Sequence, residues 1–183
     1  MESTGDIIYR VNSRDEIVFT NEEWDRFALA NGGWKVTSAN ILHRSLWDFI
    51  VDSTTCQLYH DILTQIRNHR VMGFRFRCDS PSCRRLMEMR IFPAEGATVE
   101  FRIRTLAIEH RQHQPLLESQ AVYSEKFLRM CSWCKKINVE GTWMEVEEAV
   151  RHLRLFESTS LPMLTHGVCE TCYGEMTRIY RAS

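Results

Sequence analysis

Apolar and polar residues alternate one by one in three segments in the middle of the chain. The segments 72–78, 87–91 and 99–104 each place apolar side chains on one face and Arg or Glu on the other. This period of two is typical of antiparallel strands whose second face is in water. We interpret the arginines around these strands as a solvated sheet face, to which an anion or a partner could bind. They are Arg84, Arg85, Arg102 and Arg104.

Earlier in the chain, short apolar runs and helix caps indicate two strands followed by helices. The runs 7–11 and 16–20 flank a polar turn and predict two strands. Asn21 is placed to cap a helix that Asn31-Gly32-Gly33 ends. Asp52 or Ser53 caps a second helix, which runs to about residue 69. Its apolar stripe consists of Leu58, Ile62 and Ile66. The order predicts an α+β domain: a five-stranded antiparallel sheet with helices inserted between its second and third strands.

The apolar pattern lapses near residues 111–115, which divides the chain. We expect a first domain over 1–109, a linker over 110–128 with a short helix from Ser124 to Arg129, and a small helical module over 129–183. Within that module, Thr142 and Glu145 fit a capping box that would begin a further helix.

Charge and composition limit the classes of partner. With 23 basic and 24 acidic residues among 183, the net charge of −1 gives no reason to expect a polyanion. The N-terminal residues form no apolar signal region, and no run approaches the ~20 apolar residues of a membrane span. We therefore expect a cytoplasmic protein without a membrane partner, whose thiols stay reduced.

Four of the seven cysteines form two CxxC pairs, and these predict a metal site. Cys131 and Cys134 make the first pair, and Cys169 and Cys172 the second. Each pair can supply one edge of a tetrahedron of thiolates, which favours one structural Zn²⁺ over an iron–sulfur site. His166, three residues before the second pair, is either a substitute ligand or a hydrogen-bonding neighbour of the ligands. Four sulfur ligands would close the site to water, as in structural rather than catalytic zinc centres.

These residues resemble a module of bacterial signalling proteins that commonly follows PAS or response-receiver domains. The resemblance depends on Cys131 to Ile137 (C-x-x-C-K-K-I), on Trp143, and on His166 to Cys172 (H-G-x-C-x-x-C). Residues 7–109 resemble a PAS-like sensor domain more loosely, through the order of their elements and the run Ile17 to Trp24. The resemblance implies a sensor or interaction domain joined to a zinc module, a protein partner in a signalling pathway, and a homodimer.

The inner face of the sheet could line a ligand pocket or be filled core. The candidate pocket residues are Phe27, Phe74, Phe76, Met87, Met89 and Phe101. The cysteine-bearing motif of flavin photosensors is absent, and His60 or His69 on a helix is more often structural than a haem ligand. Cys78 and Cys83 flank an expected hairpin turn, where a reversible disulfide or a second metal site is the alternative to two ordinary thiols.

The sequence predicts a cytoplasmic signalling or regulatory protein. No phosphate-binding glycine loop and no kinase, cyclase or hydrolase motif occurs, so we do not expect an enzyme. Two other functions stay open: a zinc-dependent regulator that binds nucleic acid, and a thiol-based redox sensor. The acidic run with Glu145, Glu147 and Glu148 disfavours the first, because it would repel phosphates.

Overall fold

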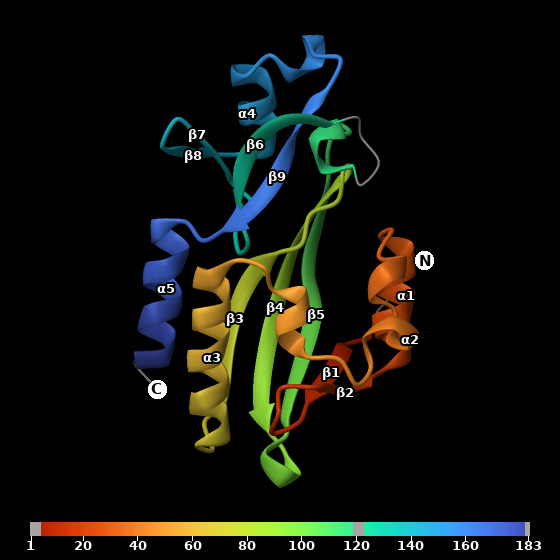
Figure 1. The fold of residues 1–183 in the computed structure, drawn as a ribbon, viewed down its shortest axis with the longest axis vertical. Helices are drawn as coiled ribbons and strands as arrows, with labels where there is room; N and C mark the ends of the chain where they lie inside the picture. The colour runs from red at the N-terminus through yellow and green to blue at the C-terminus, as the bar shows by residue number, and fades with distance from the viewer. Residues whose placement is uncertain (1–4, 119–122, 182–183) are drawn as a thin grey trace.

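The computed structural model describes residues 5–118 and 123–181, and its larger sheet is antiparallel and five-stranded (Figure 1). The strands lie in the order β2-β1-β5-β4-β3. Their bounds are β1 Ile7–Val11, β2 Ile17–Thr20, β3 Met72–Arg77, β4 Cys83–Pro93 and β5 Val99–His110. The long hairpin of β4 and β5 is in register from Cys83 opposite His110 to Pro93 opposite Val99, with one bulge. The α+β class and the five strands predicted from the sequence are confirmed.

The helices lie between β2 and β3 in the chain, also as predicted. They are α1 Glu22–Ala30, α2 Ser38–Ile41 and α3 Ser53–Arg67, with short 3₁₀ turns at Trp34–Val36 and Leu46–Phe49. Asn21 caps α1 by accepting the N–H of Trp24 at 3.1 Å, and it also accepts the N–H of Ile8 in β1 at 3.0 Å. Asp52 caps α3 through the N–H of Thr55 at 2.7 Å. These short polar side chains satisfy donors that have no partner inside a helix.

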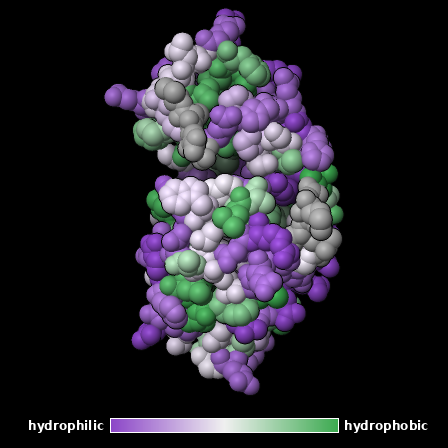
Figure 2. All heavy atoms as spheres, turned by 90° about the vertical axis from the view of Figure 1, so that its right-hand side faces the viewer, coloured by the Kyte–Doolittle hydropathy of each residue, from purple (hydrophilic) through white to green (hydrophobic). Residues whose placement is uncertain are grey.

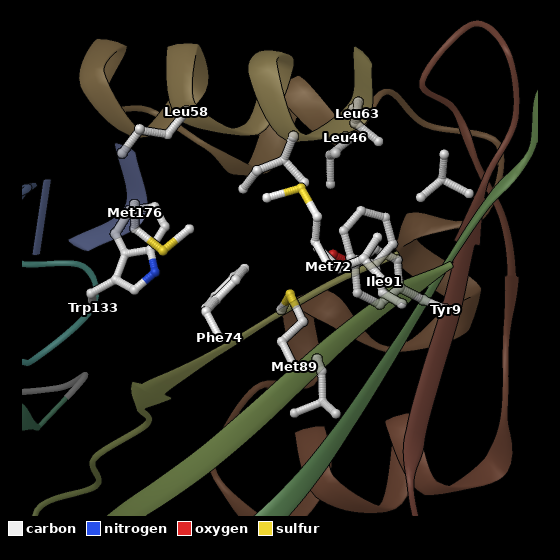
Figure 3. Packing of buried hydrophobic residues seen from close by; sticks show 14 of the residues in the cluster. Tyr9, Leu46, Leu58, Leu63, Met72, Phe74, Met89, Ile91, Trp133 and Met176 are labelled. Atoms are coloured by element: carbon white, nitrogen blue, oxygen red, sulfur yellow. The ribbon is translucent and has the colours of Figure 1, made fainter. Parts of the chain in front are cut away.

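The core lies between one face of this sheet and α3 (Figure 3). The predicted stripe of α3 is buried, with Leu58, Ile62 and Ile66 at most 1% exposed. On the sheet, Phe101 is fully buried and stacks on Tyr9 with their ring centroids 4.3 Å apart. The other face of the sheet carries the charged residues, as the period of two predicts.

The C-terminal part has a sheet of its own, in the order β8-β7-β6-β9. Its strands are β6 Tyr123–Cys131, β7 Ile137–Val139, β8 Thr142–Met144 and β9 Leu161–Gly167. The strands β6 and β9 are parallel, and the connection between them contains the β7–β8 hairpin and helix α4 (Val146–His152). Helix α5 (Glu170–Arg181) then returns beside α3 and β3 (Figure 1). Seen from the side, the molecule narrows between these two parts (Figure 2).

The prediction of a helix from Ser124 to Arg129 is wrong, because these residues belong to β6. The description of the module as helical is corrected with it, since a four-stranded sheet lies at its centre. Strand β6 pairs with β7 on one side and β9 on the other, and β9 lies more than 30 residues away in the chain. Such non-local pairing overrides local helix preference. Residues 119–122 of the predicted linker lie outside the described residues.

The capping box at Thr142 is also wrong. Glu140 and Gly141, with φ of 50° and 89°, form a two-residue turn between Val139 and Thr142, and Thr142 begins β8. Positive φ at both turn positions suits the right-handed twist of a hairpin. Helix α4 begins at Val146, and Glu145 is its N-cap residue without a side-chain capping bond. The Glu145 carboxylate instead binds Arg77 at 2.7 Å.

Candidate metal centre

The parallel pairing of β6 and β9 brings the two CxxC pairs together. Cys131 is the last residue of β6 and lies opposite Gly167, the last residue of β9. Cys169 follows β9 directly before α5, and Cys172 lies in the first turn of that helix. Because parallel strands end at the same edge of a sheet, cysteines that are distant in the chain meet there.

A tight turn holds the first pair. The N–H of Lys135 donates to the Cys131 carbonyl at 3.0 Å, and the N–H of Cys131 donates to the Lys136 carbonyl at 2.8 Å. Lys135 has a φ of 60°, a left-handed conformation that reverses the chain after Cys134. Its ammonium group donates to the Ser132 carbonyl at 2.9 Å, so one positive charge lies in the loop that carries two thiols.

The four sulfur atoms are close enough to share one ion. All four Sγ atoms lie within 4.8 Å of one another, and those of Cys134 and Cys169 are 3.8 Å apart. Four thiolates at a Zn–S distance of about 2.3 Å form a tetrahedron with edges of about 3.8 Å. Cys134 is half-buried, and the other three cysteines are buried. A buried set of four soft donors fits Zn²⁺ or an iron–sulfur centre, and disfavours Ca²⁺ and Mg²⁺.

The backbone around the sulfurs favours negative charge. The N–H of Cys169 donates to Sγ of Cys131 at 3.4 Å, and the N–H of Cys172 donates to Sγ of Cys169 at 3.4 Å. Hydrogen bonds from the thiols of Cys134 and Cys172 lower the pKa of Cys131. The bond with Cys131 raises the pKa of Cys134 to about 11. The sulfurs therefore compete for protons, and one dication could take the place of those protons.

His166 lies outside this group of sulfurs. It is exposed on β9, opposite Met130 of β6. Partial desolvation, and then the charge of Lys135, lowers its pKa. The four sulfurs form a complete tetrahedral set among the described residues without it.

The loop between the first two cysteines enters the core of the larger sheet. Trp133 is 5% exposed and lies beside Phe74 (Figure 3), with the ring centroids 6.0 Å apart. The ring of Tyr59 is 6.1 Å from it on the same basis. Its carbonyl accepts the N–H of Arg77 at 2.7 Å. Met176 of α5 lies against the same group (Figure 3). The candidate metal centre and the sheet core thus form one continuous buried cluster.

A second contact between the two parts is ionic. Arg111, 4% exposed, binds Asp79 at 3.2 Å and Glu147 of α4 at 3.1 Å. Arg84 binds Glu147 at 2.7 Å. Burial raises the pKa of Glu147, but the hydrogen bond from Arg84 and the charge of Arg111 outweigh it, and the pKa lies below its usual value. Arg84, expected on a solvated sheet face, is only 28% exposed, because it reaches Glu147 and Glu145 of the C-terminal part.

The predicted pocket residues divide into two groups. Phe27, Phe76 and Met87 line a cavity of about 250 Å³ between α1 and the sheet. In the second group, Met89 and Phe101 are buried in the filled core, and Phe74, also buried, lines a groove between β3 and α5. Arg85 lines an adjacent cavity that also contains Phe27, and its guanidinium group lies 5.8 Å from the centre of the Phe27 ring. It was expected on the solvated face of the sheet, but it faces this cavity instead.

Cys83 and His60, which the sequence singled out, have local partners. Sγ of Cys83 lies 3.4 Å from Nδ1 of His110, and burial raises the pKa of Cys78. All seven cysteines are free of disulfides. His60 stacks on Trp47 with the ring centroids 3.7 Å apart.

Over the described part of the chain, no helix combines the length and apolar character of a membrane span.

Comparison with known proteins finds several similar solved structures, and two of them are as follows. No protein-family model and no curated protein matches the chain. The PAS domain of an HTR-like protein from Haloarcula marismortui is 18% identical, covering 57% of this chain and 90% of its own, with a TM-score of 0.36. A sensory box sensor histidine kinase from Vibrio cholerae is 11% identical, covering 57% of this chain and 83% of its own, with a TM-score of 0.40. Both TM-scores are below 0.5, and the strand order and helices of this chain define its fold.

Proposed function

We propose that this chain is a signalling or regulatory protein, in which a PAS-like sensor or interaction domain is coupled to one structural zinc ion. The five-stranded sheet with helices between its second and third strands supports the first half of the proposal. The four neighbouring sulfurs of Cys131, Cys134, Cys169 and Cys172 support the second. Four thiolates leave zinc no open position for water or substrate, so we propose a structural and not an enzymatic role.

The burial of Trp133 carries the coupling. This residue lies between two of the zinc ligands in the chain, and its ring is in the core of the sheet domain. When zinc holds Cys131 and Cys134, it also fixes the backbone that presents Trp133 to Phe74 and Tyr59. A change in the packing of the sheet core would therefore reach the metal loop, and loss of zinc would loosen the core.

The first experiment is a measurement of metal content and visible spectrum on protein purified without added metal. We expect about one zinc per chain and no visible band. Cys134→Ser should lower the zinc content several-fold. The matched control is Cys56→Ser, which should keep the metal. The thiol of Cys56 donates to the Ile50 carbonyl and is not among the candidate ligands. Bound iron with a visible band would contradict structural zinc, and a chain without metal would contradict the centre altogether.

A thiol redox switch is the second candidate function, favoured by access to the sulfurs. Cys134 and Cys172 line a groove of about 370 Å³ between β3 and α5. Hydrogen peroxide would take two electrons from a pair of these thiolates and two protons from solvent, forming one disulfide and two waters while the zinc leaves as Zn²⁺. Release of zinc by mild peroxide, reversed by a dithiol reductant, is the expected result. Zinc retained throughout the oxidation would exclude the switch.

A further inference from the structure

The outer face of the five-stranded sheet is rich in arginine. Helix α3 packs on the opposite face, as Figure 1 shows, and the side chains of β1, β3, β4 and β5 alternate between the two faces. We call the outer set the arginine face. Its charged residues are Arg10, Arg75, Glu88, Arg90, Glu100, Arg102 and Arg104.

The register places two of these arginines directly opposite each other. Arg90 of β4 pairs with Arg102 of β5, between the rows Phe92–Glu100 and Glu88–Arg104. Side chains opposite each other in an antiparallel pair lie about 5 Å apart, and like charges there destabilise the sheet. The chain retains this repulsion on an exposed surface, where neutral residues would remove it.

Only two glutamates form ion pairs with four arginines on this face, among the described residues. Glu100 binds Arg10 at 2.6 Å and Arg102 at 2.5 Å, and Glu88 binds Arg104 at 2.7 Å with Arg90 at 3.6 Å. One carboxylate carries one negative charge, so the positive charge is in excess. Arg75 adds to it, since it has no ion pair within the described part of the chain. This excess stands out in a protein whose net charge is −1.

The guanidinium groups are held in place and yet open to solvent. Arg10 lies over the ring of Phe19 at 4.7 Å, and Arg102 lies over that of Phe92 at 5.2 Å. The side chains of Arg10, Arg90, Arg102 and Arg104 are between 43% and 62% exposed. Groups that are already oriented lose less freedom when a partner binds.

We propose that the arginine face is a docking surface for an acidic protein segment. Carboxylates match the forked geometry of guanidinium groups, and a row of them would neutralise the facing pair Arg90 and Arg102. Single-stranded nucleic acid fits less well. Base recognition on a sheet needs open aromatic rings, and the guanidinium groups of Arg10 and Arg102 cover Phe19 and Phe92. The proposal concerns the sheet alone and does not depend on zinc.

Charge reversal at Arg90 tests the proposal. Among the four arginines of the face that form ion pairs, Arg90 is the most exposed and has the longest contact, 3.6 Å to Glu88, so Arg90→Glu disturbs these ion pairs least. It also removes the repulsion from Arg102. We expect Arg90→Glu to keep or raise thermal stability while it weakens binding of a fluorescent peptide of alternating Glu and Ser by at least about tenfold at low salt. Arg178→Glu on the exposed side of α5 makes the same change in charge and should weaken binding by less than about twofold.

Four results would overturn the proposal. The first is that the wild type does not bind the peptide at low salt, and the second is that both variants weaken binding equally. The third is that a single-stranded oligonucleotide, or anionic phospholipid vesicles, bind more tightly than the peptide. The fourth is self-association that Arg90→Glu abolishes without any peptide binding, because the face would then pair two copies of this chain. The metal content of the wild type is measured in parallel. Loss of the zinc proposal alone leaves the docking result unaffected.

Discussion

Replacement of Trp133 by alanine tests the link between the proposed zinc site and the sheet core most directly. The side chain is 5% exposed and contacts the core of the larger sheet beside Phe74 and Tyr59. In the sequence, Trp133 lies in the loop between the candidate ligands Cys131 and Cys134. In the fold, its side chain packs in the core of the larger sheet. The variant should therefore lower the stability of the sheet and the retention of zinc together.

The magnitude follows from the burial. An aromatic side chain buries about 150–250 Å². Burial at roughly 25 cal/mol per Å² gives about 4–6 kcal/mol as an upper limit. Measured truncations of buried Phe or Trp to Ala cost about 3–5 kcal/mol, and we expect a loss in that range. Trp133→Phe should lose less, about 1–2 kcal/mol, because the smaller ring keeps part of the packing and leaves only a small cavity. The Trp133 Nε1 has no hydrogen-bond partner among the described residues, so the phenylalanine variant gives up no protein hydrogen bond.

The assay is urea unfolding followed by far-ultraviolet circular dichroism, with zinc release recorded by a chromogenic chelator. Trp34→Ala, at a tryptophan that is 62% exposed, is the matched control and should change the free energy of unfolding by less than about 0.5 kcal/mol. A loss below about 1 kcal/mol for Trp133→Ala would refute the reasoning. So would release of zinc at lower urea while the unfolding midpoint of the sheet stays the same.

Three further predictions concern charges and caps, each read from the urea midpoint. In the folded protein the pKa of Glu147 lies below its ordinary value. The ionised carboxylate therefore stabilises the fold at pH values above the ordinary carboxyl pKa, and this stability is lost as the pH falls through the folded pKa. Glu147→Gln should flatten this decline in stability at acid pH. Arg111→Ala should cost about 2–3 kcal/mol, because Asp79, with a side chain 1% exposed, keeps only Arg77; an unchanged midpoint would contradict the buried ion pairs. Asn21→Ala should cost about 1–2 kcal/mol through its two accepted N–H bonds, whereas Asn21→Asp should recover most of that loss.

Local chemistry explains why much of the larger domain could be predicted from the sequence. The period of two in β3, β4 and β5 follows from the strand geometry, since a residue either faces the core or faces water. Asn21 and Asp52 cap α1 and α3 as expected, because each satisfies donors a few residues away. Gly141 was also a usable signal, because glycine is favoured where a tight hairpin turn needs a positive φ, and the capping-box interpretation of Thr142 missed it.

The sequence by itself determined which four thiols form the candidate metal set, because the chemistry of two CxxC pairs is contained in a few adjacent residues. Only the tertiary structure decided how the two pairs meet, since β6 becomes a strand through its pairing with the distant β9. The place of Trp133 in the core of the other sheet was equally hidden. A buried aromatic residue and an exposed one look alike in a sequence, and only long-range packing distinguishes them.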